Sequence, residues 1–294
     1  MTQTACPPVQ SSHIAQELDA LRKRGTLRQI VIPPCPALLR RLQLVMAQPE
    51  PDLQEVDQIA SSDVAMAATL LRNANSPLHA IGQPVQTVGQ AMNRLGLQQT
   101  AAVLTGFMAR HTIPVNHPQL RGFWAESAQR AVAMQFLAAQ LPGMAAEVAH
   151  LHGLFCHVGI PVLMQSVRGY SGTLVEARAR LDRPFVHTEN ANHRTDHAVV
   201  GALVARAWHL PPSVMAAIRL HHELDGLGSH GAETEVHSLV AACLVADFLL
   251  RRRDGLDPES DWTRHGEAAL AWLEISSDDL SDWTPQLHAV LDAL

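Results

Sequence analysis

The sequence predicts an all-α protein that folds as a two-lobed helical bundle. Apolar residues such as Leu38, Leu42 and Val45 repeat at helical spacing, and no alternating stretch is long enough for a strand. Hydrophobic residues make up 47% of the 294 residues, but aromatic residues only 4%. A core with so few rings must be filled by Leu, Val and Ala, which favours closely packed helices.

Capping residues and chain breakers divide the first part of the chain into short helices. Ser11 or Ser12 begins a helix that Gly25 closes, and Asp63 begins another. Prolines further on place the boundary between the two lobes near residues 112–122. Helices are also expected over residues 38–46, 53–60, 88–95 and 97–111.

The second part of the chain is organised around the segment HLHGLFCHVGIPV, residues 150–162. This segment is apolar and rich in histidine, and Gly159 followed by Pro161 indicates a helix stop. An acidic linker is expected over residues 254–261. Helices are expected over residues 122–140, 145–157, 162–167, 173–181, 195–208, 213–222, 235–252, 268–273 and 281–294.

Composition and charge argue against several classes of protein. A net charge of −6 disfavours a nucleic-acid-binding surface, and the run from Arg251 to Arg253 is better explained as a helix end, where cations complement the dipole. Four cysteines without paired spacing, and no signal peptide, favour a reducing cytoplasm. The apolar run 239–250 contains Asp247 and is too short to span a bilayer, so no membrane partner is expected.

Several spaced motifs resemble those of the HDOD family, the HD-related output domains of bacterial signalling proteins. In SSDVAMAATLLRNANSPLHAIGQPVQTVGQAMNRLGLQQT, Asp63 precedes a helix that ends in Asn75-Ser76, and the next helix ends in Leu95-Gly96. The segments FWAESAQRA, HLHGLFCHVG, HAVVGALVARAWHLPPSVMAAIRLHHE and VAD then follow in the family's order. Several motifs in the correct order are far more specific than any one alone.

The resemblance covers about residues 28–250 and implies a helical fold related to the HD metal-dependent phosphohydrolases. Its C-terminal lobe would be HD-like. The implied division is a tail and short helix at 1–27, an N-terminal lobe at 28–115, the HD-like lobe at 116–253, and a linker with terminal helices at 254–294.

In HD enzymes a His-Asp pair and further His and Asp residues on separate helices bind one or two divalent ions. Cys156 and His157 stand at the positions of that pair, because Val158-Gly159 follows them. A slip of one residue would instead pair His157 with Val158. The ligand positions that the resemblance implies are His157, His197, His221, His222, Asp247 and, further upstream, Glu126.

Loss of the aspartate from the pair disfavours a centre with two ions. Two divalent ions about 3.5 Å apart repel by about 19 kcal/mol at an effective dielectric constant near 20, and bridging anions must offset this. Neutral His157 cannot bridge in that way. One Zn²⁺ or Fe²⁺ held by three histidines and Asp247 is chemically sound. The alternative, which the sequence favours, is a group of buried histidines that hold no cofactor.

The resemblance therefore favours a bacterial, cytoplasmic regulatory protein that binds a signalling partner protein, with little or no catalysis. One alternative is a mononuclear metal phosphohydrolase acting on a nucleotide or cyclic dinucleotide. Another is a sensor that binds a nucleotide without hydrolysing it. His152 and Cys156 share a helix face at i and i+4, but two donors alone do not indicate a metal site.

Overall fold

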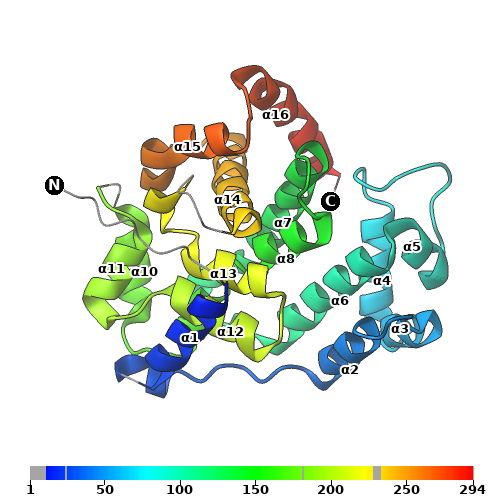
Figure 1. Cartoon of the computed structure of the whole chain (residues 1–294), viewed down its shortest axis with the longest axis horizontal. Helices are drawn as coiled ribbons and strands as arrows, with labels where there is room; N and C mark the ends of the chain where they lie inside the picture. The colour runs from blue at the N-terminus through cyan, green and yellow to red at the C-terminus, as the bar shows by residue number, and fades with distance from the viewer. Residues whose placement is uncertain (1–10, 24, 181, 228–232, 294) are drawn as a thin grey trace.

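The structure is a computed structural model (Figure 1) that describes residues 11–23, 25–180, 182–227 and 233–293. Within these ranges every regular element is helical, which confirms the all-α prediction. The elements of the first part are α1 (Ser11–Arg22), η1 (Gly25–Gln29), α2 (Ala37–Met46), α3 (Leu53–Ser61), α4 (Val64–Ala74), α5 (Val88–Leu95), α6 (Leu97–Thr112) and η2 (Pro118–Leu120).

The second part of the chain contributes the larger share of the helices. They are α7 (Phe123–Gln140), α8 (Ala146–Phe155), α9 (Gly159–Ser166), α10 (Tyr170–Ala179), α11 (Phe185–His193), α12 (His197–Ala207), α13 (Pro212–Leu220), η3 (Leu224–Gly226), α14 (Thr234–Arg253), α15 (Ser260–Trp272) and α16 (Ser277–Asp292).

Local capping explains where several of these helices begin. The Asp63 carboxylate accepts a hydrogen bond from the backbone N–H of Met66 at 2.9 Å, so α4 begins where the sequence predicts. Thr87 and Gln90 cap α5 reciprocally. Pro212 occupies the first turn of α13, where a missing N–H costs nothing.

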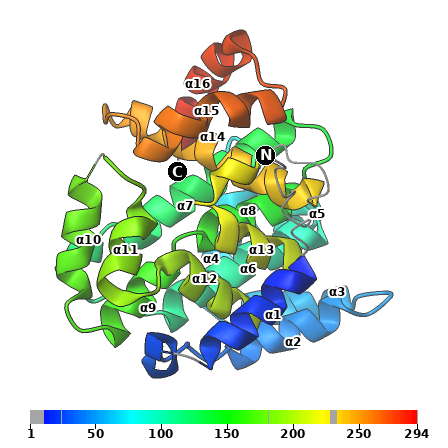
Figure 2. The ribbon, with the colours of Figure 1, turned by 60° about the vertical axis from the view of Figure 1, so that its left-hand side comes forward.

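The helices around α7 and α8 form the centre of the molecule. α7 packs along α8 and against α14, while α12 packs against both α9 and α13. Figure 2 shows α15 and α16 above this centre and α10 and α11 at one side. Helices α2 to α6 pack together on the other side (Figure 1). α1 packs against α12 and α13, far along the chain from it. The division into four segments stays a prediction.

Three details of the second part differ from the sequence-based expectations. The helix stop expected at Gly159 and Pro161 is wrong: α8 already ends at Phe155, and Gly159 begins α9, which contains Pro161 in its first turn. Proline is tolerated in a first turn. Helix α11 was not expected, because its sequence FVHTENANH has little apolar periodicity. The expected linker 254–261 runs into α15, which begins at Ser260.

Gly159 is needed because α9 lies very close to α12. A Cβ atom there would overlap the carbonyl oxygen of His197 and would come within 2.8 Å of the backbone nitrogen of Gly201. Both obstacles are backbone atoms and cannot rotate away. This close approach brings the turn before α9 next to the first residue of α12.

The stretch Ala146–Ser166 is long and apolar enough to cross a membrane by composition, but 78% of its most apolar window is buried inside the fold. It comprises helices α8 and α9 and the turn between them. This stretch is part of the protein core.

Candidate metal centre

Four histidines from three regions of the chain meet at one point. His157 lies in the turn between α8 and α9, His197 is the first residue of α12, and His221 and His222 directly follow α13. One ring nitrogen from each lies within 4.8 Å of those of the other three. The structure thus brings together four of the six ligand positions that the resemblance implies.

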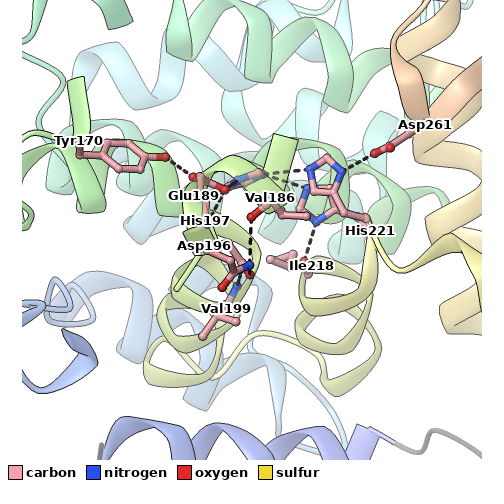
Figure 3. A network of polar contacts seen from close by, with 11 residues as sticks. Tyr170, Val186, Glu189, Asp196, His197, Val199, Ile218, His221 and Asp261 are labelled. Carbon is pink, nitrogen blue, oxygen red and sulfur yellow. Dashed lines mark hydrogen bonds and ion pairs between the residues drawn. The ribbon is translucent and has the colours of Figure 1, made fainter. Parts of the chain in front are cut away.

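Three of these rings are oriented by hydrogen bonds at Nδ1 (Figure 3). His197 Nδ1 lies 2.7 Å from Oε2 of Glu189, and His221 Nδ1 lies 2.7 Å from the carbonyl oxygen of Ile218. His222 Nδ1 lies 2.6 Å from Oδ2 of Asp261. These oxygens can only accept, so each Nδ1 carries the proton and donates it.

The opposite nitrogens of the same three rings point at one another. His197 Nε2 lies 3.2 Å from His221 Nε2 and 3.3 Å from His222 Nε2. When Nδ1 is protonated in a neutral imidazole, Nε2 carries a lone pair. The arrangement therefore sets three lone pairs against each other. One added proton can form a hydrogen bond in only one of the two contacts, either His197 to His221 or His197 to His222.

The pKa values indicate which ring takes up the added proton. Burial, followed by the neighbouring positive groups, holds the pKa of His157 and His221 well below the usual value, so both are neutral near pH 7. Burial alone would also lower the pKa of His222, but the hydrogen bond and charge of Asp261 outweigh it and raise that pKa to about 9. Without a metal, His222 is the ring that carries the extra proton.

The donor set fits one transition-metal ion. Imidazole nitrogens about 2.0–2.1 Å from a tetrahedral ion stand about 3.3 Å apart, close to the two Nε2 separations seen here. Histidines that bind metals usually donate their other N–H to a carboxylate or carbonyl, as these three do. Such a set suits Zn²⁺ or Fe²⁺. When bound, the ion would supply Lewis acidity.

Asp247 and Glu126 do not join the four histidines. Oδ1 of Asp247 lies 2.6 Å from Nε of Arg130, and both side chains are largely buried. The burial of Arg130 would lower its pKa, but Asp247 overcomes this and raises it, so Arg130 stays charged. Glu126, on α7, lines a wider cleft together with His157 and His197. Neither carboxylate belongs to the close group of four ring nitrogens, although Asp247 lines the cleft beside them.

The sequence matches the HDOD domain family over residues 32–224. The chain belongs to the HDOD family. An uncharacterised protein of Treponema pallidum is 25% identical over 257 residues, which are 87% of this chain and 48% of that protein. The HDOD chain thus spans about half of that relative's length.

Solved structures share the HDOD fold at low sequence identity. A protein from Shewanella amazonensis, provisionally named a phosphohydrolase, is 19% identical with a TM-score of 0.70, covering 95% of this chain and 96% of that one. An HDOD domain protein of unknown function from Geobacter sulfurreducens is 19% identical with a TM-score of 0.65, over 95% and 96%. A protein from Marinobacter aquaeolei, provisionally named a signal transduction protein, is 18% identical with a TM-score of 0.70, over 96% and 64%.

Two carboxylates that orient the histidines of this HDOD protein were missed by the sequence reasoning. Glu189 is completely buried on α11 and accepts hydrogen bonds from His197 and from the hydroxyl of Tyr170. Burial and the charge of Glu189 raise the pKa of Tyr170, which therefore stays protonated as a donor. Asp261 lies in the first turn of α15. In the sequence, each of these two residues is only a carboxylate in a polar stretch, and nothing else there marks it as a partner of a histidine.

A cleft of roughly 440 Å³ opens beside the histidines of the HDOD protein. Its lining includes His157, His197 and His222 as well as Arg178 and Arg183. Cationic guanidinium groups next to a histidine group favour an anionic ligand. The cleft also contains Glu126 and Asp247, so its charge is mixed.

Proposed function

We propose that this HDOD protein is a bacterial, cytoplasmic regulatory protein that acts by binding a partner protein. In place of the cofactor-free group that the sequence favours, its four-histidine centre holds one Zn²⁺ or Fe²⁺ ion, and it does not hydrolyse phosphate esters. The observation that carries this proposal is the pairing of Asp247 with Arg130, while three histidine Nε2 atoms face one another. The ion is held without the bridging carboxylate that a two-ion hydrolase needs.

Apolar side chains exposed on the first part of the chain support partner binding. Val64 is 87% exposed and Ile81 is 79% exposed, and Leu44 and Leu53 are also strongly exposed. These residues lie on or between helices α2 to α5. They precede the four histidines of the candidate metal centre by more than seventy residues in the sequence. The helices that carry these residues pack against one another, and we propose that the side chains form a common surface for a partner.

The test of this proposal measures metal and hydrolysis on the same untagged protein. We expect His221→Ala to contain about one equivalent of Zn or Fe per chain less than the wild type, and neither protein to hydrolyse bis(p-nitrophenyl) phosphate. The exposed substitution His187→Ala is the matched control and should keep the metal. Hydrolysis by the wild type that His221→Ala abolishes would contradict the proposal and would favour the mononuclear phosphohydrolase.

The arginine-containing cleft favours a second candidate function, a sensor that binds a nucleotide without hydrolysing it. Arg178 and Arg183 line the cleft beside His197. A nucleotide that binds there should raise the melting temperature of the wild type, and Arg183→Gln should reduce this shift. Chromatography of the nucleotide after incubation should show it unchanged. A shift that Arg183→Gln leaves intact would place the ligand elsewhere.

A further inference from the structure

Three further metal-binding side chains meet where α8 packs against α14. His152 lies on α8, Cys156 directly follows that helix, and Cys243 lies on α14. One donor atom from each lies within 4.8 Å of the other two, and the two sulfurs are 3.5 Å apart. His152 and Cys156 are 0% exposed, and Cys243 is 2% exposed.

His152 is the residue whose surroundings need an explanation. Neither of its ring nitrogens has a hydrogen-bond partner, although the side chain is completely buried. A buried polar group without a partner costs about 1–3 kcal/mol. Buried imidazoles normally avoid this cost, and this ring lies beside two sulfurs instead. Such a position suits a metal ligand.

We propose that His152, Cys156 and Cys243 form a second metal site, specific for a thiophilic divalent ion such as Zn²⁺. Thiolate and imidazole are the ligands of structural zinc sites. With Zn–S bonds of about 2.3 Å, two sulfurs on a tetrahedral ion stand about 3.8 Å apart, so small side-chain shifts from 3.5 Å suffice.

A carboxylate lies next to this sulfur site, although it is not one of the three grouped donors. Oδ2 of Asp247 lies 4.0 Å from Sγ of Cys243, while its Oδ1 is held by Arg130. Binding of the ion releases the two thiol protons to solvent, and the resulting thiolates balance its two positive charges. The Arg130–Asp247 pair is already neutral as a unit.

The sulfur site shares no residue with the four histidines. Cys243 nevertheless lines the same small cavity as His157 and His222, so the sulfur site borders the space beside the histidines. The sulfur site goes beyond the proposed function, because the chain could hold either ion without the other. The two sites differ in chemistry: one offers only nitrogen, the other offers sulfur.

Cobalt titration distinguishes the two sites, because only the sulfur site gives a thiolate-to-Co²⁺ charge-transfer band. We expect untagged wild-type protein, kept reduced with a phosphine, to bind two equivalents of Co²⁺ and to show this band. Cys243→Ser should lose the band and one equivalent. His221→Ala should keep the band and lose the other equivalent. Cys35→Ser, which changes a thiol outside the group, is the matched control and should behave as the wild type.

A substitution at His152 separates a metal ligand from a packing residue. His152→Leu removes a buried polar group without a partner, so the metal-free variant should be at least as stable as the wild type. Its affinity for the Co²⁺ that gives the sulfur band should fall at least about tenfold, because changing even an outer-shell partner of a ligand lowers metal affinity that much. A purely structural histidine would leave that affinity unchanged.

Zinc-edge X-ray absorption on the wild type provides a test that needs no variant. The proposal predicts sulfur as well as nitrogen in the ligand shell of the loaded protein. A shell of nitrogen and oxygen alone would overturn it. A cobalt band that is absent from the wild type, or that survives Cys243→Ser, would also overturn it.

Discussion

The two halves of this HDOD protein differ in how many ionisable side chains they bury and in how strongly they expose apolar ones. Among the residues that the structure describes, the buried polar side chains of the first half are Ser76, Gln99, Thr100 and Thr105, and none is ionisable. The second half buries His150, His152, Glu189, Asp196, His197, His221, His237 and Asp261. The most exposed large apolar side chains lie in the first half, namely Val31, Leu44, Leu53, Val64 and Ile81, whereas the second half exposes Val175 and Leu256 to a smaller fraction. The first half is therefore suited to surface contacts, and the second to chemistry in its interior.

The largest expected effect comes from adding a side chain where α9 and α12 approach each other beside the histidines. Gly159→Ala puts a Cβ against the backbone of His197 and Gly201, so α9 must move away from α12. We expect the free energy of unfolding to fall by about 3 kcal/mol, the upper range for overpacking, as read from urea denaturation. His197 moves with α12, so metal content should fall as well.

Gly172→Ala is the matched control for that substitution. Gly172 also lies in a helix, α10, but an added Cβ there meets nothing within 4 Å. Alanine should stabilise this variant by about 0.5–1 kcal/mol, because glycine is a poor helix former. Equal destabilisation by both substitutions would show that close packing at Gly159 does not build the site.

The second prediction tests the oriented interior of the second half. Glu189→Gln keeps the shape of the side chain but removes the charge that faces Nδ1 of His197. Metal affinity should fall about 10- to 100-fold, as it does when outer-shell partners of metal ligands are changed. Competition with a chromophoric chelator would measure this. Glu176→Gln, on the exposed face of α10, should leave affinity unchanged.

The third prediction concerns acid sensitivity of the buried histidines. Burial, and then the nearby His79, lowers the pKa of His150 from 6.5 to about 4. The folded state binds the proton more weakly than the unfolded chain, so stability is retained above pH 6.5 and lost as the pH falls towards 4. Between pH 7 and pH 5 this loss is on the order of 2 kcal/mol.

His150→Gln should therefore flatten the pH dependence. The amide can still bond Gln135, which lies 3.3 Å from Nδ1 of His150, but it does not titrate. Urea denaturation at pH 7 and pH 5 should show a smaller difference than in the wild type. The exposed substitution His187→Gln serves as the control. If wild type and His150→Gln lose equal stability between pH 7 and pH 5, then protonation of the buried His150 does not destabilise the second half.

Much of the fold follows from local sequence signals, because helix caps and apolar spacing act over a few residues. Asp63 begins α4 as expected, and α13 begins at Pro212, one residue before the expected start at 213. The glycine at 159 was misread, because its role is a contact with α12 that lies almost forty residues further along the chain. A local pattern cannot show such a contact. For the same reason α11, which packs against α10 and α12, escaped detection.

The candidate site was likewise predicted only in part, because some of its contacts depend on how distant helices pack. The sequence and the family resemblance pointed to His157, His197, His221 and His222, which the structure brings together. They could not show that Asp247 turns to Arg130, since that depends on how α7 packs against α14. Nor could they find the partners of the histidines, because a lone carboxylate in a polar stretch has no distinctive spacing.

The smallest effect on stability, and the sharpest test of the first half, comes from its exposed apolar side chains. The double substitution Val64→Ser and Ile81→Ser changes only exposed groups, so the free energy of unfolding should change by less than about 0.5 kcal/mol for each. Metal content should stay the same. Proteins cross-linked to the wild type in cells should be lost from the double variant but kept by Val175→Ser, an equally small change at an exposed site on α10. If the double variant retains those proteins while His221→Ala loses them, partner binding belongs to the metal-containing half instead.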